Sequence, residues 1–216
     1  MGWAGIWESR ELLLLGFWFT IILTVVTIIT STILGFVVAL GRTARVPVLG
    51  LVLRGYLELF RGTPLLIQIL FIYFGSAYLN LTGVTVFAAI VIAMTLYYGA
   101  YISEIFRAGF ESVPYGQQEA GRSLGLSRFH VIRDVIVPQT VTIVRPPLVG
   151  QYISLVKGTA LASVIGYADL VRQGQGIIDR IGSPFAVFLV VAALYFVISY
   201  PMSLVERHLE KRTVQA

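Results

Sequence analysis

Long apolar stretches alternate with short polar segments along this chain. Apolar residues dominate positions 12–40, 65–81, 84–101, 148–165 and 184–205. An α-helix rises about 1.5 Å per residue, so about 20 apolar residues cross a hydrocarbon core of about 30 Å. Each stretch is therefore predicted to be a membrane-spanning helix. Residues 81–83 join the second and third stretches, which predicts a tight antiparallel hairpin.

The segment between the first and second spans is mixed in character. Residues 41–64 begin apolar but carry several charges, at Arg42, Arg45, Arg54, Glu58 and Arg61. This pattern predicts an interfacial connector whose last part extends the second helix. There is no internal repeat, low-complexity run or long polar linker, so residues 1–216 are predicted to form a single all-α membrane domain.

Composition supports a membrane protein. Of the 216 residues, 57% are hydrophobic and 12% are charged, whereas soluble domains carry about a quarter charged residues. A soluble chain this apolar could not cover its own surface. The absence of cysteine excludes disulfides and thiolate metal sites. A cleaved secretory signal is disfavoured, because the apolar run 12–40 is too long for a signal core and lacks a small-residue cleavage site.

Basic residues are distributed unevenly between the two ends of the spans. With the N-terminus outside, the outer segments hold only Arg10, Arg172 and Arg180. Cytoplasmic segments are enriched in lysine and arginine. We therefore expect the N-terminus outside and the C-terminus in the cytoplasm. The inner segments then hold Arg42, Arg45, Arg54, Arg61, Arg107, Arg122, Arg128, Arg133, Arg145, Arg207, Lys211 and Arg212.

The longest polar stretch, residues 104–145, lies between the third and fourth spans. Pro114 suits the first turn of a helix, and Gly125 suits a left-handed C-cap. Ser127 can then cap a second helix that ends at Val137, before Pro138. The prediction is a helix, a glycine turn and a second helix that project from the membrane. The alternative is an amphipathic loop that lies on the lipid headgroups.

Small residues make the first loop helix a candidate docking element. Glu119 favours its N-terminal half, while Ala120 and Gly121 leave one side bare, where the backbone of another protein could approach closely. The run Glu119-Ala120-Gly121, then Gly125, then Val135 to Pro138 resembles the EAA motif of ABC importer permeases. In that family the motif forms the coupling helix, which sits in a cleft of the ATPase subunit. The resemblance assigns this role to Glu119, Ala120, Gly121, Ser123, Leu124 and Gly125, within a coupling loop at about 107–145.

Further segments are similar to the branch of that family that transports polar amino acids such as histidine, glutamine and arginine. They are YLELFRGTPL at 56–65, GAYISEIFRAG at 99–109 and QYISLVKGTALAS at 151–163. The resemblance covers essentially the whole chain. The departure that matters is Gly158, which follows Lys157 where the branch commonly has Asp or Asn.

The resemblance implies the ABC importer permease fold with five transmembrane helices, in a bacterial cell membrane. It implies a non-catalytic subunit that moves a polar amino acid, basic ones included, into the cytoplasm by alternating access. The implied partners are two ATPase subunits that hold ATP and magnesium, a second permease chain, identical or related, and an extracytoplasmic amino acid-binding protein. No cofactor is expected in this chain, and no nucleic acid partner.

The sequence lacks the residues of other mechanisms. No G-x-x-x-x-G-K-[ST] phosphate loop is present, so energy must come from a partner. His130 and His208 stand alone in polar segments, which disfavours a metal site. No acidic cluster lies beside a nucleophile, which disfavours a membrane-embedded enzyme. An ion-driven secondary transporter is the remaining alternative, but the internal repeats and mid-membrane acidic ligands typical of that class are missing.

Counting helix rises from the span starts identifies candidate residues for the substrate path. Lys157 lies about 14 Å into the fourth span, near mid-membrane, where a charge usually faces a bundle interior or a wet cavity. It could bind the substrate carboxylate, or it could be structural, bonding backbone carbonyls or extending toward Glu58. Tyr97 or Tyr98 could stack on a cationic side chain. The path candidates are Gln68, Tyr97, Tyr98, Gln151, Ser154, Lys157 and Thr159. At the cytoplasmic ends, Glu58, Arg61, Glu104 and Arg107 are expected to form gate or structural ion pairs.

Overall fold

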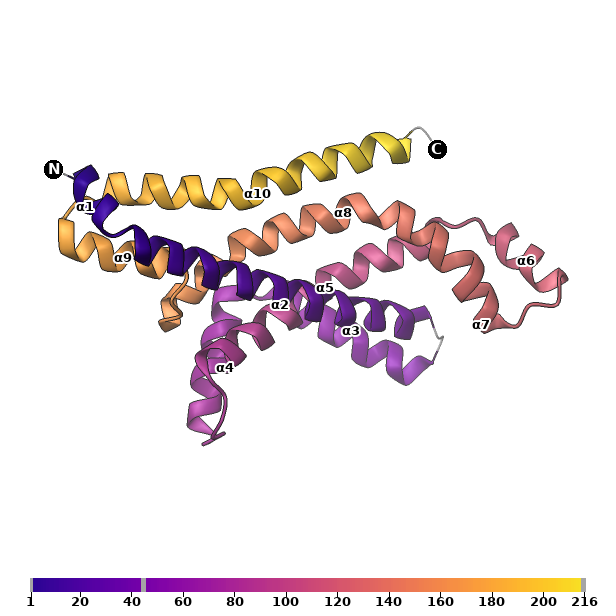
Figure 1. Cartoon of the computed structure of the whole chain (residues 1–216). Helices are drawn as coiled ribbons and strands as arrows, with labels where there is room; N and C mark the ends of the chain where they lie inside the picture. The colour runs from indigo at the N-terminus through magenta and orange to yellow at the C-terminus, as the bar shows by residue number, and fades with distance from the viewer. Residues whose placement is uncertain (1, 44–45, 215–216) are drawn as a thin grey trace.

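The computed structural model describes residues 2–43 and 46–214, and all elements within these ranges are helical. Arg45, one of the basic residues expected inside, lies outside the described residues. Figure 1 shows the long helices lying roughly along one direction, with the two termini at opposite ends of the molecule. The two loop helices α6 and α7 project at the same end as the C-terminus (Figure 1). This arrangement agrees with an N-terminus and a C-terminus on opposite sides of a membrane.

The elements follow one another in a single chain of helices. In order they are α1 Gly2–Glu8, α2 Arg10–Thr43, α3 Pro47–Gly62, α4 Leu65–Tyr78, α5 Val86–Ser112, α6 Tyr115–Ser123, α7 Arg128–His130, the π-helical turn η1 Val131–Ile136, α8 Val137–Gly158, the 3₁₀ segment η2 Thr159–Ile165, α9 Leu170–Ile181 and α10 Pro184–Val214.

Within the described residues, four helices are long and apolar enough to cross a membrane. They are Arg10–Thr43, Val86–Ser112, Arg128–Ile165 and Pro184–Lys211. A fifth crossing is available if α3 and α4 together count as one broken span. The all-helical membrane fold predicted from the hydrophobic pattern is confirmed.

The second predicted span is broken where a continuous helix was expected. The axes of α3 and α4 meet at 107°, so the prediction that segment 41–64 extends the second helix is wrong. Pro64 disfavours the helical conformation for the residue before it, and Thr63 is extended, at φ −118° and ψ 146°. The side-chain amide of Gln68 then donates to the carbonyl of Phe60 at 2.9 Å and to that of Thr63 at 3.1 Å. The bend is thus fixed by a proline and by a buried amide that caps the end of α3.

Pro138 does not end the loop helix, contrary to the prediction. The helical path continues from Arg128 to Ile165, so the fourth span begins well before residue 148. Directly before the proline the chain makes a π turn, in which the N–H of Val137 bonds the carbonyl of Ile132. Proline lacks an N–H donor and its ring crowds the preceding turn. The wider π turn accommodates Pro138 without a break.

Small residues bring α2 and α5 into close contact. A Cβ atom at Gly35 would lie 2.6 Å from Cγ2 of Ile102, so only glycine permits this approach. Ala39, one turn further along α2, is fully buried, as are Ala89 and Ala93 on α5. These small residues of α2 and α5 therefore lie in the packed interior.

A buried carboxylate holds the outer end together. Asp169 is fully buried and caps α9, because its Oδ1 accepts the N–H of Arg172 at 2.9 Å. The hydroxyl of Tyr195 on α10 donates to Oδ2 at 3.4 Å. The next residue, Leu170, donates its N–H to the hydroxyl of Thr20 on α2 at 3.1 Å. The cap of α9 thus joins α9 to α10 and to α2, which is distant in sequence.

Candidate functional site

The surface of α8 differs from that of α2. Along α2, large apolar side chains recur on one exposed stripe, at Trp18, Ile22, Val25 and Ile29 among others, as expected for a helix in contact with lipid. Between residues 148 and 163, by contrast, the exposed residues are Ser154 and Lys157. A polar exposed face at membrane depth indicates contact with water or with another chain.

Lys157 lies on this polar face with no compensating partner. It is exposed, and its side chain makes no ion pair or hydrogen bond with the described residues. Ser154 and Gln151 lie three and six residues before it, so the three share one side of α8. The structure therefore brings these three predicted path residues together on one side of α8, where Ser154 and Lys157 are exposed and Gln151 is half-buried.

Tyr98 stands behind this face and meets α8 at Gly158. Its side chain is 3% exposed, and its hydroxyl donates to the carbonyl of Ser154 at 3.1 Å. A Cβ atom at Gly158 would overlap this hydroxyl. Gly158, the residue that departs from the pattern of the amino acid branch, is therefore the position against which Tyr98 packs.

Three tyrosines of α5, Tyr98, Tyr97 and Tyr101, form ring contacts that run toward the inner end of the helix. Tyr97 is half-buried, and its ring centroid lies 5.1 Å from that of Tyr98 and 5.0 Å from that of Tyr101. The guanidinium of Arg61 lies 5.4 Å from the Tyr101 ring. Tyr101 was not among the predicted path residues, although its four-residue spacing from Tyr97 on one helix face was a usable signal.

Two predicted path residues lie elsewhere. Thr159 is fully buried, and its hydroxyl donates to the carbonyl of Val156 at 2.7 Å. Gln68 is also buried, and its amide N–H groups are engaged at the bend between α3 and α4. Neither belongs to the exposed stripe of α8.

Charged residues gather at the inner ends of α2, α3 and α5. Glu104 pairs with Arg42, with Arg107 at 2.9 Å and with Arg61 at 3.7 Å. Arg107 also pairs with Glu111 at 2.5 Å. Three of the four residues predicted to form ion pairs thus lie together, namely Glu104, Arg61 and Arg107. Through Arg42 and Arg61, Glu104 links α5 to α2 and α3.

Glu58, the fourth predicted member, is exposed and makes no ion pair with the described residues. Arg42 takes part instead, although sequence reasoning did not select it. The spacing between Glu104 and Arg107 predicts their pairing along one helix, whereas the position of Arg42 depends on how α2 packs against α5.

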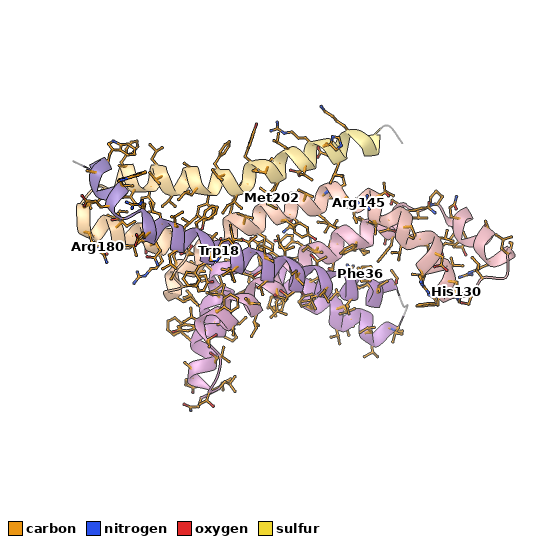
Figure 2. All side chains as sticks on the ribbon, in the orientation of Figure 1. Trp18, Phe36, His130, Arg145, Arg180 and Met202 are labelled. Carbon is orange, nitrogen blue, oxygen red and sulfur yellow. The ribbon has the colours of Figure 1, made fainter. Side chains whose placement is uncertain are left out.

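The projecting loop has the predicted local structure. α6 ends before Gly125, whose φ of +79° is left-handed, a conformation that favours glycine. Ser127 caps the next helix by accepting the N–H of His130 at 3.4 Å. Figure 2 shows His130 in this loop, at the opposite end of the molecule from Arg180.

The two small residues of α6 point in different directions. A Cβ atom at Gly121 would lie 3.1 Å from Cγ2 of Val131, so Gly121 packs against its own chain. Ala120 and Leu124 are exposed, the latter at 82%. The expectation that Ala120 and Gly121 share one bare side is therefore wrong, since only Ala120 lies on the outward face.

The described residues offer no candidate metal site, since no three His, Asp or Glu side chains converge in them. The arrangement defines a helical membrane protein with a polar face at membrane depth, an ion-pair cluster at its inner end and a projecting helix–turn–helix loop. That combination fits a membrane transport protein.

Comparison with known proteins identifies the family within this class. Residues 31–215 match the family model described as binding-protein-dependent transport system inner membrane component. The chain belongs to this family, and the resemblance to ABC importer permeases is confirmed. The protein is thus a multi-pass inner-membrane protein.

Individual relatives cover nearly the full chain. The glutamine transport system permease protein GlnP of Escherichia coli K12 is 36% identical over 97% of this chain and 96% of its own. The L-cystine transport system permease protein TcyB of Bacillus subtilis is 39% identical over 91% of this chain and 84% of its own. A crystal structure of an amino acid ABC transporter with histidines matches at a TM-score of 0.89 and 34% identity, over 98% of this chain and 99% of that one.

Proposed function

We propose that this chain is the membrane-spanning subunit of an ATP-driven importer for a polar amino acid. The observation that carries the proposal is the exposed polar stripe of α8, where Lys157 stands at membrane depth without a partner among the described residues. The named substrates of the relatives, glutamine and cystine, are both polar amino acids.

One chain is too small to enclose a path, so a second permease chain, identical or related, completes it. The stripes of two α8 helices then line an aqueous route. The Lys157 ammonium is suited to the α-carboxylate that every amino acid substrate carries. The ring of Tyr97 could stack on a cationic side chain, which supports including basic amino acids among the substrates.

The energy of ATP hydrolysis is transmitted to the membrane helices through the projecting loop. Two partner ATPase subunits bind ATP and magnesium, and each holds one coupling segment, Glu119 to Gly125. Closure of the ATPase pair moves the loops and switches the path from inward-open to outward-open. An extracytoplasmic binding protein delivers the amino acid. The outward face of α6, with Ala120 and Leu124 exposed, supports this docking role.

Uptake into proteoliposomes tests the proposal. The permease, reconstituted with its ATPase subunit and binding protein, is expected to accumulate labelled glutamine, cystine, histidine or arginine only when ATP is supplied on the ATPase side. Uptake driven by an ion gradient without the ATPase subunit would identify a secondary transporter instead. Mass spectrometry of ligand bound to the purified complex identifies the particular amino acid.

A further inference from the structure

A cavity opens at the inner end of the molecule, between the membrane helices and the projecting loop. Its volume is about 840 Å³, and its walls come from the ends of α2 and α5, from α3, and from α6, α7 and η1. Figure 1 shows α6 and α7 projecting beyond the ends of α2 and α3. The cavity thus lies where the hydrocarbon core gives way to cytoplasm in the predicted topology.

The charge of the cavity is strongly positive. Its lining carries five arginines against one glutamate, Glu111. Arg42 and Arg107 are already paired with Glu104, and Arg107 also neutralises Glu111. The side chains of the remaining three, Arg54, Arg122 and Arg128, make no ion pair or hydrogen bond with the described residues.

These three arginines come from three separate elements. Arg54 belongs to α3, Arg122 to α6 and Arg128 to α7. Guanidinium groups are suited to bidentate contact with phosphate oxygens, and three of them around one cavity would repel one another without an anion. Apolar residues such as Phe110, Val131 and Ile136 also line the cavity.

The cavity also adjoins a surface suited to lipid. Near its start, α3 exposes Val48 at 74%, Leu51 at 74% and Val52 at 63%. An apolar face beside a basic cavity at the cytoplasmic boundary matches the two parts of an anionic phospholipid, acyl chains and phosphate.

The cavity remains accessible when a partner docks on α6. Tyr115, Gln118 and Arg122 line the cavity and share one side of the helix, at spacings of three and four residues. Ala120 and Leu124 lie on the other side and are exposed. An ATPase subunit on that outward face would leave the cavity side of α6 free.

We infer that this cavity binds the phosphate of an anionic phospholipid headgroup through Arg54, Arg122 and Arg128. Such a lipid connects α3 in the membrane to both loop helices, so its occupancy would stiffen the loop against the spans. The same chemistry would accept free phosphate, so the two sources must be separated by experiment.

The test titrates short-chain phosphatidylglycerol into the detergent-purified full-length protein, with phosphatidylcholine of equal chain length and inorganic phosphate as separate arms. Native mass spectrometry counts the bound molecules. The triple variant Arg54→Gln, Arg122→Gln, Arg128→Gln is expected to bind phosphatidylglycerol about a hundredfold more weakly, since each basic residue near an anionic surface contributes about fivefold. Arg54→Gln alone is expected to lose about fivefold, and it serves if the triple variant does not purify.

A matched control removes three other arginines of the predicted cytoplasmic side, Arg133, Arg145 and Arg207, by the same change to glutamine. These do not line the cavity, and Figure 2 shows Arg145 on α8. If the control variant binds phosphatidylglycerol about as tightly as the unmodified protein does, the result supports the site. Equal loss in both triple variants, unchanged binding in the cavity variants, or no preference for phosphatidylglycerol over phosphatidylcholine would each overturn it. Binding of inorganic phosphate that also depends on Arg54, Arg122 and Arg128 would reassign the source to free phosphate and overturn the lipid assignment.

Discussion

The hydroxyl of Tyr98 occupies the space in which a side chain at residue 158 would begin. Tyr98 also donates to the carbonyl of Ser154, one turn before Gly158 on α8. The tyrosine and the glycine therefore form a matched pair that sets the distance between α5 and α8 directly behind the exposed polar stripe.

This pairing predicts non-additive effects of substitution. Gly158→Ala is expected to destabilise the protein by about 1–3 kcal/mol, the usual cost of overpacking. Tyr98→Phe should cost about 1 kcal/mol through the lost hydrogen bond. Because the clash involves chiefly the hydroxyl, the double variant should be more stable than the sum of the two predicts. Thermal unfolding of the purified variants measures this coupling, and strict additivity would contradict the pairing.

Lys157→Met is expected to abolish transport and substrate-stimulated ATP hydrolysis while the amount of assembled complex stays normal. Within the described residues the Lys157 side chain makes no ion pair or hydrogen bond whose loss would weaken the chain. Lys157→Arg, which keeps the charge, is the control and should retain more activity. A reduced amount of complex would indicate a structural role between chains, and normal transport would exclude both roles.

Gly125→Leu is expected to leave the protein in the membrane but uncouple ATP hydrolysis from transport. A β-carbon at a left-handed φ costs about 1–2 kcal/mol, which would distort the turn between α6 and α7. Gly182 offers a matched control, since its φ of +64° imposes similar strain at the outer end. Gly182→Leu should keep transport and hydrolysis coupled, and Glu119→Lys should uncouple them. Normal coupling in Gly125→Leu and Glu119→Lys would show that the loop does not transmit energy.

Asp169 should make stability depend on pH. Burial raises the pKa of this carboxyl from 3.8 to about 6, against the opposing effect of its hydrogen bonds. The folded chain therefore binds the proton more tightly than the unfolded chain, so stability is greatest below the unfolded pKa and is lost as pH rises through about 6. Melting temperatures recorded across this range should fall with rising pH. Asp169→Asn, which can still cap α9, should flatten the trend.

Topology is tested with reporter fusions. A reporter after Gly83 should be accessible from outside, and one after Gly125 or Ala216 should be cytoplasmic. The prediction rests on the arginines, since Arg172 and Arg180 lie at one end and Arg122 and Arg128 at the other. A reversed pattern would contradict both the orientation and the docking of an ATPase subunit on the loop.

Most of the confirmed predictions depended on residues that are close to one another in the sequence. The apolar runs located four spans, Gly125 located the loop turn, and Ser127 located the following cap, because each depends on residues close in sequence. The hydrophobic pattern could not reveal the bend after α3, which depends on the Gln68 side chain reaching back to Phe60. The prediction that the loop helix ends before Pro138 failed for a similar reason, because the π turn that accommodates this proline leaves no pattern in the residue types.

Partnerships between distant residues were the hardest to predict. The contact of Arg42 with Glu104, and that of Tyr98 with Gly158, exist only because particular faces of long helices meet. Depth counting selected Gln151, Ser154 and Lys157 together with Gln68 and Thr159. Only the packing of the other helices decides which of these polar groups remain exposed.

The unbroken helical path through Pro138 has a mechanical consequence. From Arg128 to Lys157 the path is a bent lever about 44 Å long along its contour (Figure 1), which runs from the projecting loop to the exposed polar stripe of α8. A swing of about 5° at the loop would displace Lys157 by about 4 Å at that length. The π turn and Pro146–Pro147 are the places where such a lever can flex, so they determine how much of the loop's motion arrives at the lysine.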